Sequence, residues 1–147
     1  RPIVISLNTN PYIKSDLIDY FISCYDYRLF FEVNKILKLN KKIIMPLNSL
    51  AKTLPVYHQK NILNYGLIKK KKRFRSFSKY CELEDPRALS YALLIISQSK
   101  IKSISTAFID GYNNNKVENK LLQKVISSFS NDNKIKINFL TKTLFRN

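Results

Sequence analysis

The order of short apolar runs and helical segments is the feature that most constrains how this chain can fold. Its clearest stretch begins with residues 85–96, which are mostly apolar and predict a buried helix. Asp85 is a candidate N-cap, and Pro86 suits the first helical position. Residues 103–109 then predict a buried strand, and residues 117–129 predict a second helix with a polar face. Helix, strand, loop and helix in this order form the unit of an α/β protein.

The rest of the chain repeats this alternation. Further strands are predicted at residues 2–7, 20–24, 42–46, 61–66 and 135–140. Helical or turn segments are predicted at residues 14–19, 26–39 and 48–54. The alternation favours a single Rossmann-like α/β domain over residues 1–147, with a mostly parallel sheet and helices on both faces in three layers. Gly66 and Gly111 are the only glycines, so the sequence has no glycine-rich phosphate loop.

The length and the two ends of the sequence bound the class of protein. A chain of 147 residues suits one domain with its own core. It opens on a predicted strand without an initiator methionine, so we expect a fragment of a longer protein. No apolar run approaches the roughly 18 residues that cross a bilayer, and we expect no signal peptide before the first strand. We therefore expect a cytoplasmic protein.

The chain is strongly basic, with a formal net charge of +16. Such a charge is compatible with nucleic acid or an anionic surface as a partner. Codon bias is the favoured explanation of the charge. Lys, Asn and Ile, the amino acids that AT-rich codons favour, make up 53 of the 147 residues, and Arg supplies only 6 of the 26 basic residues. Basicity that is poor in Arg lacks the bidentate donors that specific phosphate readers use. The composition therefore disfavours nucleic acid as a partner.

One dense basic tract, residues 69–75, stands apart from this spread of lysines, with Phe74 and Phe77 interleaved in it or beside it. As a functional element, the tract could hold RNA, acidic lipid or an acidic protein tail. As a structural element, it is a solvated surface loop, and this second interpretation is favoured.

Cysteine and histidine usage argues against a metal site. Cys24 and Cys81 lie far apart, and each follows an apolar or aromatic segment, so we predict two buried free thiols and no disulfide. His58 is the single histidine, and its spacing from the cysteines does not fit a zinc site. We expect no metal and no cofactor in this chain.

Polar residues that follow two predicted strands are the candidate ligand-binding residues. Asn8 and Asn10 follow the first strand, and Asp110, Gly111 and Tyr112 follow the strand at 103–109. In open α/β sheets, ligands bind in the crevice beyond the carboxyl ends of the strands. Each residue also has a structural interpretation. Asn8, Asn10 and the Asp110–Gly111 pair suit turns, and Tyr112 could cover the edge of the sheet.

Several short segments resemble the C-terminal domain of bacterial 4-hydroxy-2-oxovalerate aldolase-like (HMG-CoA lyase-like) surface-polysaccharide biosynthesis proteins. The matching segments are residues 8–11, 19–20, 63–66, 80–81, 91–93 and 108–112. The resemblance implies an α/β domain fused to an aldolase barrel. It further implies that a catalytic divalent metal, where there is one, belongs to that barrel, outside this chain.

The same domain is distantly similar to bacterial lipooligosaccharide sialyltransferases. Their strand ends in Gly-Ile-Asp-Phe-Tyr, comparable with residues 108–112, and an Asn comparable with Asn8 follows another strand. The resemblance implies that Asn8, Asp110 and Tyr112 line a nucleotide or sugar pocket. Those enzymes place a histidine base beyond the motif, whereas His58 lies in another segment. We therefore assign no catalytic residue to this chain.

Three functions follow from these observations. The leading hypothesis is a nucleotide- or sugar-binding accessory domain of a bacterial surface-carbohydrate biosynthesis protein, without catalysis of its own. Under this hypothesis, the longer protein is an aldolase or lyase, or a glycosyltransferase. The second hypothesis is a sialyltransferase-like glycosyltransferase that uses a CMP-sugar. The third is a basic module that binds RNA or an anionic surface through residues 69–75.

Overall fold

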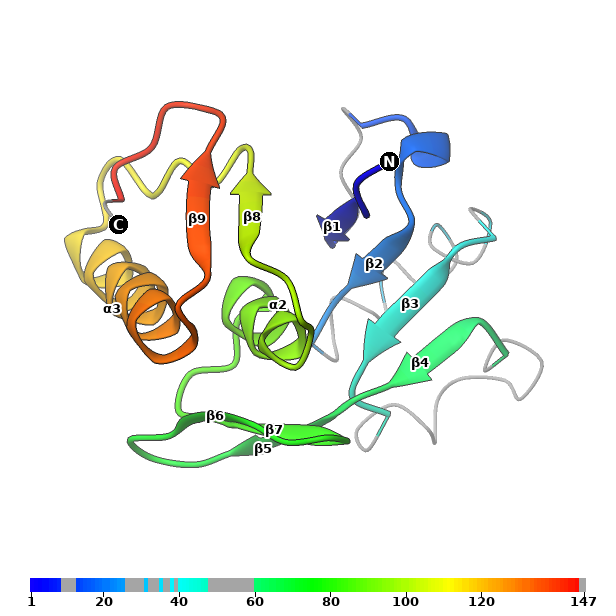
Figure 1. Ribbon diagram of the computed structural model, residues 1–147, viewed down its shortest axis with the longest axis horizontal. Helices are drawn as coiled ribbons and strands as arrows, with labels where there is room; N and C mark the ends of the chain where they lie inside the picture. Colours follow the sequence, from blue (N-terminus) through cyan, green and yellow to red (C-terminus); the bar gives the residue numbers. More distant parts are fainter. Residues whose placement is uncertain are drawn as a thin grey trace. The chain divides into compact units, whose positions relative to one another are not determined.

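The structure, a computed structural model, describes residues 1–8, 13–25, 31, 35, 38, 40–47 and 60–145 (Figure 1). It has mixed α/β content with parallel strand pairs, which confirms the predicted class. The chain divides into two compact units, Arg1–Ala92 and Leu93–Asn147. The boundary between them falls within helix α2 (Ala88–Ser97). The single domain predicted over residues 1–147 stays a prediction.

A four-stranded parallel sheet lies in the first unit. Its strands are β1 (Ile5–Leu7), β2 (Tyr20–Ile22), β3 (Lys42–Met45) and β4 (Ile62–Asn64). They are ordered β1-β2-β3-β4, every neighbouring pair is parallel, and their arrows point the same way in Figure 1. The strands predicted in these segments are confirmed, although each is shorter than expected. The first is also less buried than expected, because only Ser6 of β1 is buried.

The core of this sheet is built from apolar residues of β2 and β3. Its fully buried members are Ile18, Phe21, Ile43 and Met45, and Val4, Ile13 and Ile62 pack against them. Ile18 follows a short 3-10 helix, η1 (Ser15–Leu17), which agrees with the helical or turn segment predicted at residues 14–19. Burying one such side chain contributes about 1.5–3 kcal/mol to folding. These few side chains are therefore a large part of what holds the sheet together.

A second, three-stranded sheet corrects the prediction for residues 69–75. The strands β5 (Gly66–Lys69), β6 (Phe74–Ser76) and β7 (Tyr80–Leu83) are ordered β5-β7-β6. β5 is parallel to β7, and β6 is antiparallel to it. The basic tract is therefore not a long loop, because its two ends belong to strands on opposite edges of β7. The strand was missed because the run of basic residues masks its alternation: in β6, Arg75 is exposed between two partly buried neighbours.

Tyr65 separates β4 from β5 and contacts three other elements. Its backbone N–H donates to the Met45 carbonyl at the end of β3 (3.2 Å). Its hydroxyl donates to the Phe77 carbonyl (2.8 Å) and lies 2.7 Å from the Ser76 hydroxyl. Its carbonyl accepts a hydrogen bond from the buried Tyr91 hydroxyl of α2, and the two rings lie 5.9 Å apart. The run predicted as one strand at 61–66 is therefore divided at Tyr65.

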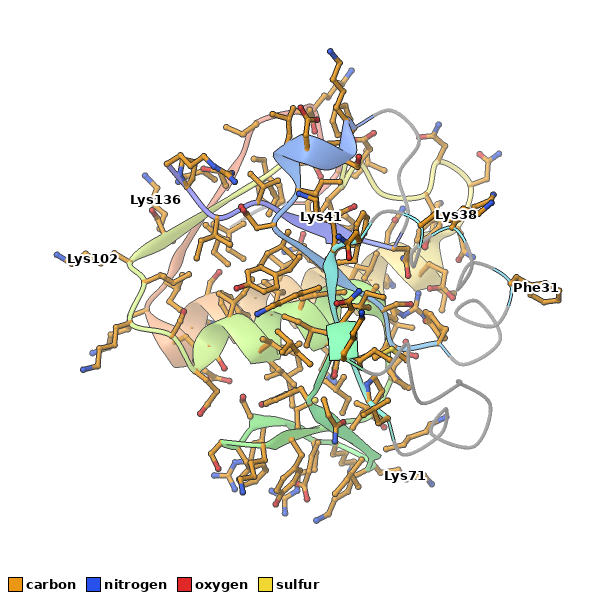
Figure 2. The ribbon with its side chains drawn as sticks, turned by 90° about the vertical axis from the view of Figure 1, so that its right-hand side faces the viewer. Phe31, Lys38, Lys41, Lys71, Lys102 and Lys136 are labelled. Atoms are coloured by element: carbon orange, nitrogen blue, oxygen red, sulfur yellow. The ribbon has the colours of Figure 1, made fainter. Side chains whose placement is uncertain are left out.

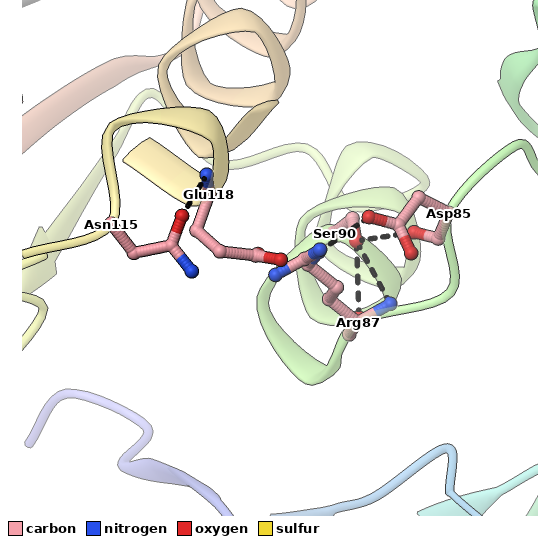
Figure 3. Close-up of polar contacts among 5 residues, drawn as sticks. All are labelled: Asp85, Arg87, Ser90, Asn115 and Glu118. Atoms are coloured by element: carbon pink, nitrogen blue, oxygen red, sulfur yellow. Dashed lines mark hydrogen bonds and ion pairs between the residues drawn. The ribbon is translucent and has the colours of Figure 1, made fainter. Parts of the chain in front are cut away.

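Helix α2 begins later than the sequence predicts. Asp85 is not its N-cap and Pro86 is not its first helical residue, because the helix starts at Ala88. The Arg87 N–H donates to the Ser90 hydroxyl (3.2 Å), so a side chain in the first turn of the helix satisfies a backbone N–H at its start. The Asp85 carboxylate instead accepts from the Arg87 guanidinium, with Nε and Oδ2 2.5 Å apart (Figure 3).

The second unit contains a parallel strand pair and a long helix. β8 (Ser103–Thr106) pairs with β9 (Lys136–Phe139), and α3 (Lys116–Asn133) connects them. Asn115 caps α3 by accepting from the Glu118 N–H at 3.1 Å (Figure 3). The predicted helix is thus confirmed and is longer than expected. Its buried residues recur at helical spacing; they are Leu122, Ile126 and Phe129.

Strand β8 is shorter and more exposed than the sequence predicts. The apolar end of the predicted strand, residues 107–109, continues as irregular chain after Thr106. Phe108 has a φ of +60°, which no extended strand allows, and its side chain is exposed. Residues of β8 alternate between exposed and partly buried, so this strand is not of the fully buried kind.

Some predicted elements lie outside the described residues. This applies to the helix at 48–54 and to most of the helix at 26–39. In the latter segment, Phe31, Lys35 and Lys38 are helical and exposed, and Figure 2 shows Phe31 and Lys38. No helix among the described residues is long and apolar enough to span a membrane. Cys24 and Cys81 are buried and neither belongs to a disulfide, as predicted, and burial raises the pKa of Cys81 to about 12.

We expect Gly66→Ala to destabilise the three-stranded sheet. A Cβ at this position would lie 2.8 Å from the Cβ of Tyr80, which belongs to the neighbouring strand and cannot rotate away. Overpacking of this kind costs about 1–3 kcal/mol. Urea unfolding followed by circular dichroism should show that decrease in the free energy of unfolding. Ser78→Ala in the exposed turn is the control, and an unchanged midpoint for Gly66→Ala would contradict the packing described.

We expect Tyr91→Phe to lower the free energy of unfolding by about 1–3 kcal/mol, because the carbonyl of Tyr65 would lose its buried donor. Burial raises the pKa of the Tyr91 hydroxyl, so this group stays a neutral donor at physiological pH. Thermal and urea unfolding measure the effect. Tyr112→Phe, at an exposed ring, is the matched control and should change stability little.

Candidate ligand-binding site

The candidate site is the β8–α3 loop, residues 107–115, in the second unit. It begins where the parallel strands β8 and β9 both reach their carboxyl ends, which lie side by side in Figure 1. The Leu140 N–H donates to the Thr106 carbonyl (2.8 Å) and extends the pairing of the strands by one step. The loop therefore leaves the sheet at the edge where α/β proteins commonly bind ligands.

Two threonines after β9 hold the first half of the loop. Thr141 accepts a hydrogen bond from the Phe108 N–H (2.8 Å), and its hydroxyl lies 3.3 Å from Oδ1 of Asp110. The Thr143 hydroxyl donates to the Ile109 carbonyl (2.7 Å). The Leu144 N–H donates to the Asp110 carbonyl (3.0 Å). The backbone around Asp110 is thus fixed by bonds from a segment more than 30 residues away in sequence.

Asn119 of α3 holds the second half of the loop. Its side-chain carbonyl accepts from the Tyr112 N–H (2.8 Å), and its amide nitrogen donates to the Tyr112 carbonyl (2.6 Å). One amide side chain therefore satisfies both backbone groups of Tyr112, as a neighbouring strand would. This leaves the Tyr112 ring to face solvent, and its exposed fraction is 51%.

Gly111 is required by the shape of the loop. Its φ of +94° lies in a region that residues with side chains rarely adopt. An added Cβ would lie 3.1 Å from the Asn119 side-chain oxygen and 3.2 Å from a methyl group of Leu144. A larger residue between Asp110 and Tyr112 would therefore have a strained backbone, and Asn119 and Leu144 would have to shift slightly to admit it.

The loop exposes two aromatic rings and one carboxylate. Phe108 is 65% exposed, and Asp110 is also exposed. Phe108 has a φ of +60°, which is unusual for a bulky residue and recurs at functional sites. Aromatic faces pack against flat or apolar ligand surfaces, and a carboxylate accepts hydrogen bonds from hydroxyl and amine groups. This combination suits a ligand with a ring and several hydroxyls.

Three of the five predicted ligand-binding residues are consecutive in sequence and lie in the candidate site. Asp110, Gly111 and Tyr112 lie in the β8–α3 loop, whereas Asn8 belongs to the first unit and Asn10 lies outside the described residues. Asn8 follows β1 with a φ of +60°, and its side-chain oxygen accepts from the Ser23 hydroxyl (3.1 Å). This contact gives Asn8 a structural role at the end of β1, and its role in ligand binding stays a prediction.

Sequence reasoning missed the residues that position the loop, namely Asn119, Thr141 and Thr143. All three lie outside the loop and become its neighbours only through the packing of α3 and β9. A sequence signal was present for the threonines, because Thr-Lys-Thr follows directly after the last predicted strand. Hydroxyl side chains at a strand end commonly bond to nearby backbone. Asn119 had no such signal, since it lies inside a predicted helix.

The described residues contain no group of three or more His, Cys, Asp or Glu that could hold a metal ion. Comparison of the chain with protein-family models, with curated proteins and with solved structures found no match.

We expect Asn119→Ala to loosen the β8–α3 loop. Two backbone hydrogen bonds of Tyr112 would be lost, and because the loop is exposed, water would replace them in part. The loss should be about 1–2 kcal/mol in the free energy of unfolding. Faster amide exchange confined to residues 110–115 would accompany it. Asn113→Ala, an exposed residue of the same loop, is the control. Unchanged exchange at Tyr112 would contradict the clamp.

Proposed function

We propose that this chain is a nucleotide- or sugar-binding domain and that the β8–α3 loop binds the ligand. The observation that carries the proposal is the loop itself. Asp110 lies between Phe108 and Tyr112 along the loop, all three side chains are exposed, and the backbone is held by Thr141, Thr143 and Asn119. Side chains that bind ligands are usually placed in this way, on an irregular segment held by a rigid scaffold.

The chemistry of the loop favours the sugar part of a ligand. A carboxylate bridges vicinal hydroxyls well, and acidic residues commonly bind ribose hydroxyls in α/β nucleotide-binding domains. The apolar face of a sugar ring, or a nucleobase, packs on an aromatic ring. A carboxylate repels phosphate, so within this loop Asp110 is assigned to hydroxyl groups, and the phosphates of a nucleotide would lie away from it.

The resemblance to aldolase-like and sialyltransferase proteins extends the proposal. It supports a Rossmann-like, three-layer domain and an accessory role in bacterial surface-carbohydrate biosynthesis, beside an aldolase barrel in a longer protein. The sequential parallel order β1-β2-β3-β4 and the succession of α2, β8, α3 and β9 also support the Rossmann-like assignment. The proposal is limited to binding, and this chain is given no catalytic step.

Isothermal titration of the 147-residue chain tests the proposal, with cytidine, CMP, UDP and N-acetylneuraminic acid as probes. We expect saturable binding of at least one probe with a single site per chain. Asp110→Asn should weaken it about tenfold or more, because the charged acceptor for two hydroxyls is lost. Asp132→Asn removes the same charge from an exposed position near the end of α3, and it should leave the affinity unchanged.

Two outcomes would overturn the proposal. One is the absence of saturable binding for every probe. The other is equal weakening by Asp110→Asn and Asp132→Asn, which would show that net charge and not the loop determines the affinity. Thermal unfolding of both variants serves as the folding control. Because both carboxylates are exposed, we expect each change to shift stability by less than about 0.5 kcal/mol.

A further inference from the structure

The three-stranded sheet of the first unit has a buried face and an exposed face. On β7, Cys81 and Leu83 are buried, whereas the alternating residues Tyr80 and Glu82 are partly exposed. Because side chains alternate between the two faces of a strand, register assigns the neighbouring residues to a face. Ile68 and Arg75 pair with Glu82 across the ladders and therefore share its exposed face. Ile68 is 45% exposed.

Two aromatic rings belong to the same exposed face. The Phe77 N–H donates to the Tyr80 carbonyl (2.8 Å), so these residues are opposite each other where the β6–β7 hairpin closes. Their rings are stacked, with centroids 4.5 Å apart and planes inclined by 14°. Phe77 follows directly after β6, two residues beyond Arg75, so continuing the alternation of the strand places both on one face. The stacked rings of Phe77 and Tyr80 form an aromatic pair at one end of the sheet.

The basic turn, defined as residues 69–73, lies at the other end of the sheet. It crosses the end of β7, where the Lys70 N–H donates to the Leu83 carbonyl (2.8 Å) and the Glu84 N–H donates to the Arg73 carbonyl (3.0 Å). All five side chains of the turn are exposed. Residues 66–84 carry seven basic and two acidic side chains, a net charge of +5. The fold therefore keeps this run of cations together at one end of the sheet.

Little of this charge is compensated within the described residues. Lys70 pairs with Glu82, with Nζ and Oε1 3.0 Å apart, and this pair neutralises the acidic side chain of the exposed face. Among the residues that the structure describes, Lys69, Lys71, Lys72 and Arg73 take part in no ion pair. Figure 2 shows the Lys71 side chain directed away from the sheet. Four cations at one end of a short sheet are thus available to an anionic partner.

We propose that this sheet is a second binding surface and that its partner is single-stranded RNA. The phosphates would contact the basic turn, and a base would stack on the Phe77–Tyr80 pair across the exposed face. A strand of three residues spans about 10 Å, so one short oligonucleotide can reach both ends. Basic grooves that carry aromatic platforms bind single strands in this way, with little preference for sequence.

Composition alone disfavours nucleic acid, because the lysines are numerous and arginines are few. That argument concerns specific base reading, whereas single-strand binding needs only cations for phosphates and rings for bases. An anionic membrane fits the surface less well. A segment that enters the lipid interface needs apolar side chains at its tip, and the basic turn consists of four Lys and one Arg. The aromatic pair would also have no role at such a surface.

Fluorescence anisotropy with a labelled oligouridylate of about ten nucleotides tests the proposal at about 50 and 200 mM salt. The central variant changes Lys69, Lys71, Lys72 and Arg73 to Gln. We expect it to weaken binding at least tenfold and to reduce the slope of log affinity against log salt by about 3. Phe77→Leu should weaken binding about fivefold or more through lost stacking, with the salt slope unchanged.

A matched variant separates a local surface from net charge. Lys100, Lys102, Lys134 and Lys136 are exposed in the second unit, and the Lys136 N–H donates to the Lys102 carbonyl (3.1 Å; side chains in Figure 2). Changing these four residues to Gln also removes four of the formal +16 charges. This variant should keep its affinity within about threefold, since log affinity depends mainly on contacted phosphates.

Three results would overturn the proposal. They are no binding at low salt, equal losses in the two fourfold variants, or tighter binding to vesicles of phosphatidylcholine and phosphatidylserine than to RNA. Urea unfolding confirms that each variant is folded before its affinity is compared. Asp110→Asn should leave RNA binding unchanged, so this proposal and the proposed function succeed or fail separately.

Discussion

The contacts of Tyr65 are the constraint on which the first unit depends. This residue ends one sheet and precedes the next, and its backbone and hydroxyl reach β3, β6 and α2. A buried carbonyl or hydroxyl must find a partner, or folding loses about 1–3 kcal/mol for each. Because three such groups belong to one residue, any change in where β4 ends would leave several of them without a partner. The position of the basic turn is set by this same arrangement, since β5 begins at the next residue.

The β8–α3 loop applies the same rule to irregular chain. A loop without a neighbouring strand must satisfy its backbone groups with side chains or water. Thr141, Thr143 and Asn119 do so here, and the loop residues are left free to direct their own side chains outward. Phe108, Asp110 and Tyr112 are exposed as a consequence. The proposed ligand-binding role depends on this division between residues that hold the loop and residues that face solvent.

The two proposed surfaces differ in how their affinity should respond to solution conditions. The β8–α3 loop offers one carboxylate and two rings, so hydroxyl geometry should determine its affinity and salt should change it little. The exposed face of the three-stranded sheet offers several cations and a stacked aromatic pair, so its affinity should fall steeply with salt. The two surfaces lie in different compact units of the chain, and one variant in each is enough to examine them independently.

Prediction from sequence succeeded where hydrophobic period decided the structure and failed where long-range contacts did. The runs at 20–24, 42–46 and 135–140 form strands in which apolar residues are buried. The helix at 117–129 follows from apolar residues at helical spacing. A local contact explains a further error: Asp85 was wrong as an N-cap because the helix starts only at Ala88, and the Asp85 carboxylate pairs with Arg87 in the turn before it. The strand at 103–109 was too long because bonds from residues after β9 hold the Phe108 backbone in another conformation.

By itself, the sequence determined the α/β class, the buried thiols and the irregular segment at Asp110 and Gly111, because each depends on local residue chemistry. Tertiary structure decided which polar groups meet. It placed Asn119 against Tyr112, and it placed the two ends of the basic tract on opposite edges of β7. The physical reason is that the N–H and C=O groups of a buried or irregular backbone need hydrogen-bond partners, and these come from whichever side chains folding brings near. That neighbour is set by the packing of distant elements and not by the order of residues along the chain.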